Sequence, residues 1–259
     1  MRADLVSGWR LGWRLAMRGI RSKYRRSMLG YFWAVLPILA TTVIWVVLNA
    51  SGIVSIQGTG IAYPAFVLIN ITLWQGFIDS LFCPIHQMES AGSMLTKVNF
   101  ARESLIFAGL IEVLFMFSIR LVLLLAGLLW FGVPLQWAIL LAPVAIAALM
   151  LLGMTLGLLL LPVSMLYEDV HRGLIIASSL WLFATPVVYP PPTTWPFVLL
   201  TYANPVTPLL VTARELLTTG VISQPIGFML FGSLTLILAV GALVLYRLAM
   251  PHLIVRISS

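Results

Sequence analysis

Residues whose side chains could carry out chemistry are few in this sequence, and they lie far apart. His86, His171 and His252 each lack a second His or Cys at the spacing of metal ligands, so we predict no metal site. Glu168 and Asp169 are adjacent, but neighbouring helix positions diverge by about 100°, which favours a polar turn over a catalytic carboxylate pair. The chain contains no Gly-Lys pair, hence no G-x-x-x-x-G-K-[ST] phosphate loop, and no G-x-S-x-G motif. We therefore predict no catalytic residue and no cofactor on this chain.

Four ionisable residues lie within or beside apolar stretches, where an unpaired charge is costly. Asp79 and Glu103 lie close to the predicted ends of these stretches, and we expect both to reach water. Glu112 and Arg120 lie deeper and are separated by about 12 Å of helix rise, which is too far for a direct pair. Each of these two needs another partner or a polar cavity, so structural pairing and a role in a transport path both remain open.

The elements that hold these residues are long apolar helices. With 61% hydrophobic and 9% charged residues, the 259-residue chain cannot hide its apolar surface inside a water-soluble domain. A bilayer core about 30 Å thick needs roughly 20 apolar residues of helix. Six continuous runs of this kind lie near 30–50, 61–83, 104–131, 135–161, 171–189 and 226–247. They predict an all-α integral membrane protein with six transmembrane helices, in one domain covering 1–259.

The distribution of basic residues predicts the orientation, because short basic flanks stay in the cytoplasm. Eight basic residues precede residue 27, whereas the loops on the opposite side contain only Arg214, beside Glu215. Both termini are therefore expected in the cytoplasm, with no cleavable signal peptide. The net charge of +7 suits an anionic membrane leaflet and needs no nucleic acid. The single cysteine, Cys83, permits no internal disulfide.

The basic N-terminal segment, residues 1–28, has the pattern of an amphipathic helix. Apolar residues recur at spacings of three and four, and a cationic series follows one position later. The apolar series is Leu5, Trp9, Trp13, Met17, Ile20 and Tyr24, and the cationic series is Arg10, Arg14, Arg18, Arg21 and Arg25. We expect this helix to lie along the cytoplasmic membrane surface. A simple juxtamembrane anchor without a partner is the alternative.

Residues 185–210 are apolar but contain seven prolines, so they cannot form one spanning helix. The breaks leave two apolar pieces, near 194–203 and 207–218, each about half the length needed to cross a membrane. Irregular backbone at membrane depth survives only where protein buries it or water bathes it. We therefore predict a re-entrant pair of short helices within 190–218, at the outer mouth of a pore between the fifth and sixth helices.

Five motifs in order around these runs resemble the permease subunits of bacterial ABC type-2 polysaccharide exporters, which move O-antigen, capsule or teichoic-acid chains. The motifs are IRSKYRRSMLGYFWAVLP (20–37), SMLTKVNFARE (93–103), YEDVHRGL (167–174), TPVVYP (185–190) and ANPVTPLLVTARELL (203–217). The resemblance covers nearly the whole chain. Two positions depart from the pattern: Gly19 stands where an acidic residue is usual, and Ala101 where a proline is common.

The resemblance implies a homodimer with a pore between two six-helix halves, each docked on a separate ATPase subunit that binds ATP and Mg. Residues 1–28 would be the interface helix, with Trp9, Trp13, Arg14, Arg18 and Arg21. Residues 84–102 would couple to the ATPase, a solvated connector being the alternative. The coupling residues would be Met88, Glu89, Leu95, Lys97, Arg102 and Glu103. The external gate would use Pro190, Pro191, Pro192, Trp195, Asn204, Pro205, Arg214 and Glu215.

Aromatic residues in runs one, two and five, which line the pore in the family, indicate the substrate class. Sugar rings present C–H faces that pack on aromatic rings, so such a channel suits a polysaccharide. The channel residues would be Tyr31, Trp33, Trp45, Phe66, Trp74, Trp181, Phe183 and Tyr189. An ordinary belt of interfacial aromatic residues is the alternative.

Three functions are compatible with this sequence. The first is ATP-driven export of a lipid-linked polysaccharide, of O-antigen or capsule type, across the bacterial inner membrane. The second is export of small lipophilic molecules or drugs, although such exporters usually have a larger external region than residues 51–60 leave. The third, a membrane enzyme that builds glycans, would need carboxylates and a donor-binding loop that the sequence lacks.

Overall fold

The computed structural model describes residues 2–24, 29–91, 103–134 and 136–258, and within these residues it contains helices and no strand. In chain order the elements are α1 (Arg2–Tyr24), the 3-10 helix η1 (Gly30–Ala34), α2 (Leu36–Ala50), α3 (Tyr63–Ala91), α5 (Glu103–Trp130), the 3-10 helix η2 (Trp137–Leu141), α6 (Ala142–Leu166), α7 (Glu168–Ala184), α8 (Val198–Ala203), α9 (Val206–Leu217) and α10 (Pro225–Ser258). The predicted all-α class is confirmed for these residues.

Four helices in this part of the chain are long and apolar enough to cross a membrane: Tyr63–Ala91, Glu103–Trp130, Trp137–Leu166 and Pro225–Met250. They match four of the six predicted runs. The first run, 30–50, is instead divided at Val35 into η1 and the 15-residue α2. The fifth run, 171–189, forms the 17-residue α7, which ends at Ala184. Six spans therefore remain a prediction.

Local sequence explains where these helices begin and end. Pro37 and Pro143 lie in the first turns of α2 and α6, where the missing N–H has no helical partner to lose. Thr185, the residue before Pro186, has the extended backbone that proline imposes, and α7 ends before it. Gly132 takes a φ of +66° just after α5, and the Val133 N–H donates to the Leu128 carbonyl at 2.9 Å.

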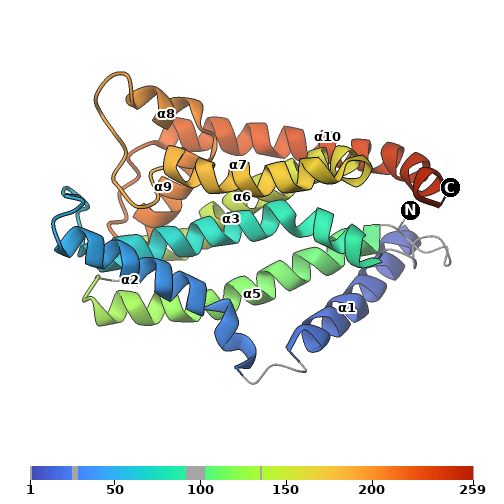
Figure 1. Cartoon of the computed structure of the whole chain (residues 1–259), viewed down its shortest axis with the longest axis horizontal. Coiled ribbons are helices and arrows are strands. Elements are labelled where there is room, and N and C mark those ends of the chain that lie inside the picture. The colour runs from blue at the N-terminus through green and yellow to red at the C-terminus, as the bar shows by residue number, and fades with distance from the viewer. Residues whose placement is uncertain (1, 25–28, 92–102, 135, 259) are drawn as a thin grey trace.

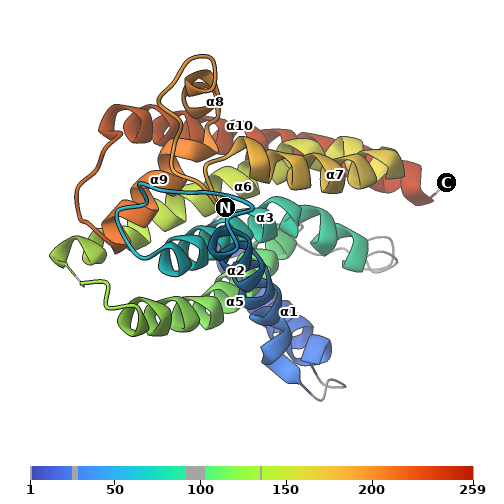
Figure 2. The same cartoon turned by 60° about the vertical axis from the view of Figure 1, so that its left-hand side comes forward.

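The centre of the bundle is α3, and 83% of its most apolar stretch is buried (Figure 1). It packs against α2, α5, α6 and α9. The helix α10 instead lies along α6, and only 11% of its most apolar 18-residue stretch is buried. In both cartoon views α3 lies between α5 and α7 (Figures 1 and 2). The start of α1 and the end of α10 lie at one end of the bundle, and α8 and α9 lie at the other (Figure 1).

The contact between α3 and α6 depends on two glycines four residues apart, Gly153 and Gly157. A Cβ added to Gly153 would lie 2.5 Å from the Phe77 carbonyl oxygen, and one added to Gly157 would overlap the Leu81 carbonyl oxygen. Small residues at this spacing let two helix backbones approach closely, as in membrane-protein helix pairs. Sequence reasoning missed this local signal.

The N-terminal helix α1 is confirmed as a helix, but a different stripe makes its main contact. Its inward side is formed by the small Gly12 and Ala16 with Ile20, and a Cβ at Gly12 would lie 2.9 Å from the Ser104 carbonyl oxygen of α5. The predicted tryptophan stripe lies farther out. Trp13 is 49% exposed, as is Trp9 at 46%, although the Trp9 ring meets the Phe107 ring edge-on with centroids 5.7 Å apart. The cationic side chains of Arg10, Arg14, Arg18 and Arg21 are exposed.

Candidate polar cavity and its surroundings

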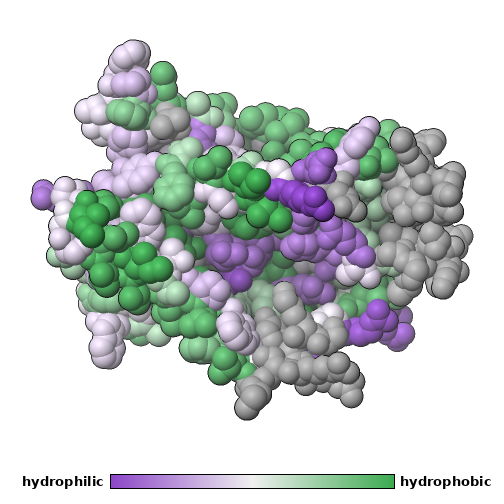
Figure 3. Space-filling model, in the orientation of Figure 1, coloured by the Kyte–Doolittle hydropathy of each residue, from purple (hydrophilic) through white to green (hydrophobic). Residues whose placement is uncertain are grey.

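A cavity of about 550 Å³ opens between α1, η1, α3 and α5. Its polar and charged lining comes from Gln75, Asp79, His86 and Gln87 of α3 and from Glu112 and Arg120 of α5. The exposed Trp33 of η1 lines one side. Hydrophilic residues gather over the middle of this face of the molecule, between apolar side chains (Figure 3). A polar cavity between two membrane-length helices is a site where charge can be kept inside an apolar bundle.

The deepest charge in this cavity, Arg120, is paired. Its Nη1 contacts the Asp79 carboxylate, and its Nε donates to the Ala34 carbonyl at 3.1 Å. Gln75 Nε2 donates to the other Asp79 oxygen at 2.9 Å. Structural pairing is therefore confirmed for Arg120. The Asp79 side chain is 26% exposed, as expected of a residue that reaches water, and it also pairs with the Arg120 guanidinium.

The second deep charge, Glu112, lies against α1 at Gly19. A Cβ added to Gly19 would overlap a Glu112 carboxylate oxygen, so a side chain at position 19 has no room. The structure thus accounts for the departure of Gly19 from the usual acidic residue. The carboxylate that fills this space comes from α5.

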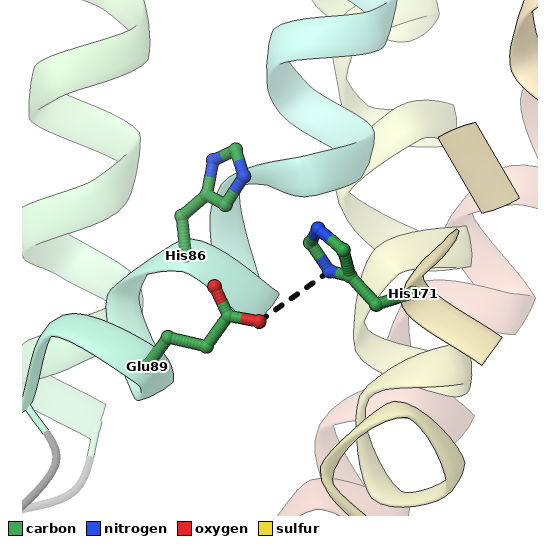
Figure 4. A group of neighbouring side chains, drawn as sticks. All are labelled: His86, Glu89 and His171. Carbon is green, nitrogen blue, oxygen red and sulfur yellow. Dashed lines mark ion pairs between the residues drawn. The ribbon is translucent and has the colours of Figure 1, made fainter. Parts of the chain in front are cut away.

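Beyond the cavity, the structure brings together three side chains that are distant in sequence. His86 and Glu89 near the end of α3 converge on His171 in the first turn of α7, and their ligand atoms all lie within 4.8 Å of one another (Figure 4). The prediction that each histidine is isolated from a second one is wrong for this pair. The sequence separation of 85 residues carries no signal, and only the i, i+3 spacing of His86 and Glu89 hinted at a shared face.

The predicted channel aromatics fall into two groups. Phe66 and Trp74 are buried in the core of the chain, at 1% and 4% exposure. Trp74 and Phe77 meet Trp181 edge-on at 6.4 and 5.5 Å between ring centroids. The apolar packing around α3 is the reason that Phe66 and Trp74 are buried.

The remaining channel aromatics are more accessible. Tyr31, Trp33 and Phe183 are exposed, and Trp45 lies 6.5 Å from Phe183 between ring centroids. The half-buried Tyr189 donates its hydroxyl hydrogen to the Phe183 carbonyl at 2.6 Å.

The predicted coupling residues lie only partly within the described chain. Residues 84–91 continue α3 through Pro84. Leu95, Lys97 and Arg102 fall outside the described residues. Met88 is buried and lies 4.0 Å from the Tyr246 hydroxyl, so it serves packing. Glu103 begins α5 and pairs with Arg247 of α10 at 3.2 Å.

The proline-rich segment contains the two predicted short helices, as α8 and α9. Asn204 and Pro205 separate them. The buried Asn204 accepts hydrogen bonds from Trp181 Nε1 and from the Val206 N–H, both at 3.1 Å. Its amide donates to Thr185 Oγ1 at 2.8 Å. Asn204 therefore ties the break between α8 and α9 to the end of α7.

Other predicted gate residues differ in exposure. Pro190, Pro191 and Pro192 are half-buried, whereas Trp195 is 79% exposed. Arg214 of α9 is buried, and its guanidinium lies 4.8 Å from the centre of the Phe66 ring. Glu215 accepts hydrogen bonds from the Ser223 N–H at 2.8 Å and the Ser223 hydroxyl at 2.6 Å, which fixes the loop before α10.

The fold and cavity define a helical membrane protein with charged groups held inside its bundle and without a phosphate-binding loop. No protein-family model matches the chain. Over 176 residues it is 26% identical to the O-antigen export system permease protein RfbA of Myxococcus xanthus. This segment covers 68% of the chain and 66% of the relative, just under two thirds of its length. The relative is an export permease, which agrees with the family that the motifs resemble.

Proposed function

We propose that this chain is the transmembrane subunit of an ATP-driven exporter that moves a lipid-linked polysaccharide across the bacterial inner membrane. The observation that carries the proposal is the charged cavity between α3 and α5, which is lined by paired charges within a bundle of membrane-length helices. An ionisable residue inside the membrane part of a protein is by default a candidate for a functional site such as a substrate path. The named activity of the O-antigen export relative favours a polysaccharide of that class.

The proposed subunit has six spans, with both termini in the cytoplasm. η1 and α2 together extend about 32 Å, from five residues at about 2.0 Å and fifteen at about 1.5 Å, enough for a core about 30 Å thick. In α7, 17 residues give about 25 Å of helix, and the segment after Ala184 supplies the remainder. The helices α8 and α9, about 9 and 18 Å long, are too short to cross and form the external gate.

The proposed pore lies between two copies of the chain. Val43, Ile44 and Val47 of α2 are each more than half exposed, as are Ile176, Leu180 and Phe183 of α7. These two apolar surfaces, with the Trp45 and Phe183 pair, suit a face that a second copy and a sliding sugar chain share.

A separate ATPase subunit binds ATP and Mg and hydrolyses the ATP, because this chain has no phosphate-binding loop. It docks at the end that carries the termini. There the exposed cations of α1, including Arg14, Arg18 and Arg21, offer a charged surface to anionic lipid headgroups or the ATPase.

Reconstitution tests this proposal. Inside-out vesicles that contain the chain and a soluble P-loop ATPase subunit should take up lipid-linked polysaccharide when ATP is added. The chain alone should hydrolyse no ATP. ATP-driven uptake of a lipophilic dye without uptake of polysaccharide would favour the small-molecule exporter. Nucleotide hydrolysis by the purified chain would exclude the assignment of ATP hydrolysis to a separate subunit.

A further inference from the structure

We propose that His86, Glu89 and His171 form a binding site for a divalent transition metal, best suited to Zn²⁺, which joins the end of α3 to the start of α7. The proposal concerns residues beside the cavity and is independent of the transported substrate. It rests on the positions, burial and donor chemistry of these three side chains.

The three side chains come from two helices and converge. His86 and Glu89 are three residues apart on α3, which places them on one face of that helix. His171 lies four positions into α7, which begins at Glu168 directly after α6. Figure 4 shows the carboxylate of Glu89 below both imidazole rings, with one oxygen paired with His171.

The distances suit a small tetrahedral ion. Bonds of about 2.0 to 2.1 Å from zinc to nitrogen or oxygen place two ligand atoms about 3.3 Å apart at a tetrahedral angle. His171 Nδ1 and Glu89 Oε1 are already 3.4 Å apart. All three ligand atoms lie within 4.8 Å of one another, and rotation of the exposed Glu89 side chain can bring its carboxylate closer to the imidazoles.

The burial of one His171 atom, Nδ1, is a second observation, while the side chain as a whole is 22% exposed. Its Nδ1 is buried and makes no hydrogen bond within the described residues, although the carboxylate of Glu89 faces it. A buried polar atom without a hydrogen bond is costly, and a metal bond would satisfy it.

Phe82 holds both imidazole rings in place. Its ring stacks on His86 and meets His171 edge-on, with centroids 5.8 Å away in each case. Fixed ring orientation is what a metal site needs from the residues around its ligands.

The donor set selects the class of metal. Two imidazoles and one carboxylate favour Zn²⁺ or a neighbouring first-row ion, whereas Mg²⁺ and Ca²⁺ prefer oxygen ligands alone. Three protein ligands leave a fourth position for water. Because His86 also lines the cavity, a bound ion would fix α3 to α7 at the cavity rim.

Cobalt titration tests the site with the full chain. The protein is purified in detergent with a histidine-free tag, and Co²⁺ binding is followed through its visible absorption bands, with Zn²⁺ as competitor. We expect one ion per chain, displaced by Zn²⁺. His86→Ala, Glu89→Gln and His171→Ala should each weaken binding at least about tenfold. His171→Cys should retain binding because a thiolate is also a zinc ligand.

The matched control is His252→Ala, which removes the remaining histidine of the chain and should bind Co²⁺ like the wild type. Size-exclusion profiles confirm that each variant is folded, and the exposed positions of His86 and Glu89 make this the expected result. Failure of the wild type to bind Co²⁺ or Zn²⁺ would overturn the proposal. Equal binding by the wild type and a folded His86→Ala, His171→Ala double variant would also overturn it.

Discussion

The pair of Asp79 and Arg120 predicts an asymmetric response to substitution. In Asp79→Leu the guanidinium is left with a side-chain exposure of 9%, and it cannot lose its proton. In Arg120→Met the carboxylate keeps its 2.9 Å hydrogen bond from Gln75 and is 26% exposed. The aspartate substitution should therefore be the more damaging of the two.

The magnitudes follow from what each variant leaves unpaired. Asp79→Leu strands a buried cation and should lower the free energy of unfolding by about 3 to 5 kcal/mol. Arg120→Met loses charged hydrogen bonds but leaves a partnered acid, and should cost about 1 to 3 kcal/mol. The double variant removes both charges and should lie within about 1 kcal/mol of the wild type, because an apolar pair of similar volume replaces a buried ion pair with little loss.

Unfolding by SDS in mixed micelles, followed by tryptophan fluorescence, measures these differences, since the chain has nine tryptophans. The four proteins form a double-mutant cycle, with an expected coupling of at least about 2 kcal/mol. A double variant that costs the sum of its two parents, or an arginine variant less stable than the aspartate variant, would refute the reasoning.

Three further predictions concern helix contacts and the short helices. Gly157→Ala should lower stability in the SDS unfolding assay by about 1 to 3 kcal/mol, since the added methyl overlaps the Leu81 carbonyl. Gly232→Ala, with nothing within 4 Å, should be neutral or stabilising in the same assay. Asn204→Ala should cost about 1 to 3 kcal/mol and increase protease cleavage near α8, whereas Tyr202→Ala, an exposed neighbour, should do neither. Cysteines placed at the exposed Thr194 and Thr219 should both react with a membrane-impermeant reagent added from outside. The buried Cys83 should give little background labelling. Labelling of Thr219→Cys only from the cytoplasm would contradict the external gate.

The sequence predicts those features that depend on local signals. Runs of about 20 apolar residues predicted the long helices, and the Asn204-Pro205 step predicted the break between α8 and α9. Both follow from the hydrogen bonding of the backbone, which must be satisfied within the helix in lipid and which lacks a donor at each proline.

The pairing of residues from different helices is not a local feature, and the sequence did not predict it. Asp79 and Arg120 are 41 positions apart, and His86 and His171 lie on different helices, so their contacts depend on how the helices pack. The packing of α1 against α5 was not predicted either. Hydrophobicity favoured its tryptophans, whereas close approach to α5 requires the small Gly12 and Ala16.

The exposed helix α10 has a consequence for the response of the protein to its membrane. Its apolar part, Pro225–Met250, is 26 residues or about 39 Å long, which exceeds a hydrocarbon core of about 30 Å. A helix with such hydrophobic mismatch tilts, and the tilt changes with bilayer thickness. Because Arg247 near the end of this stretch pairs with Glu103 at the start of α5, a change in tilt would pull on the helix that carries Glu112 and Arg120. Lipid chain length is thus expected to change the load on this contact between α10 and α5.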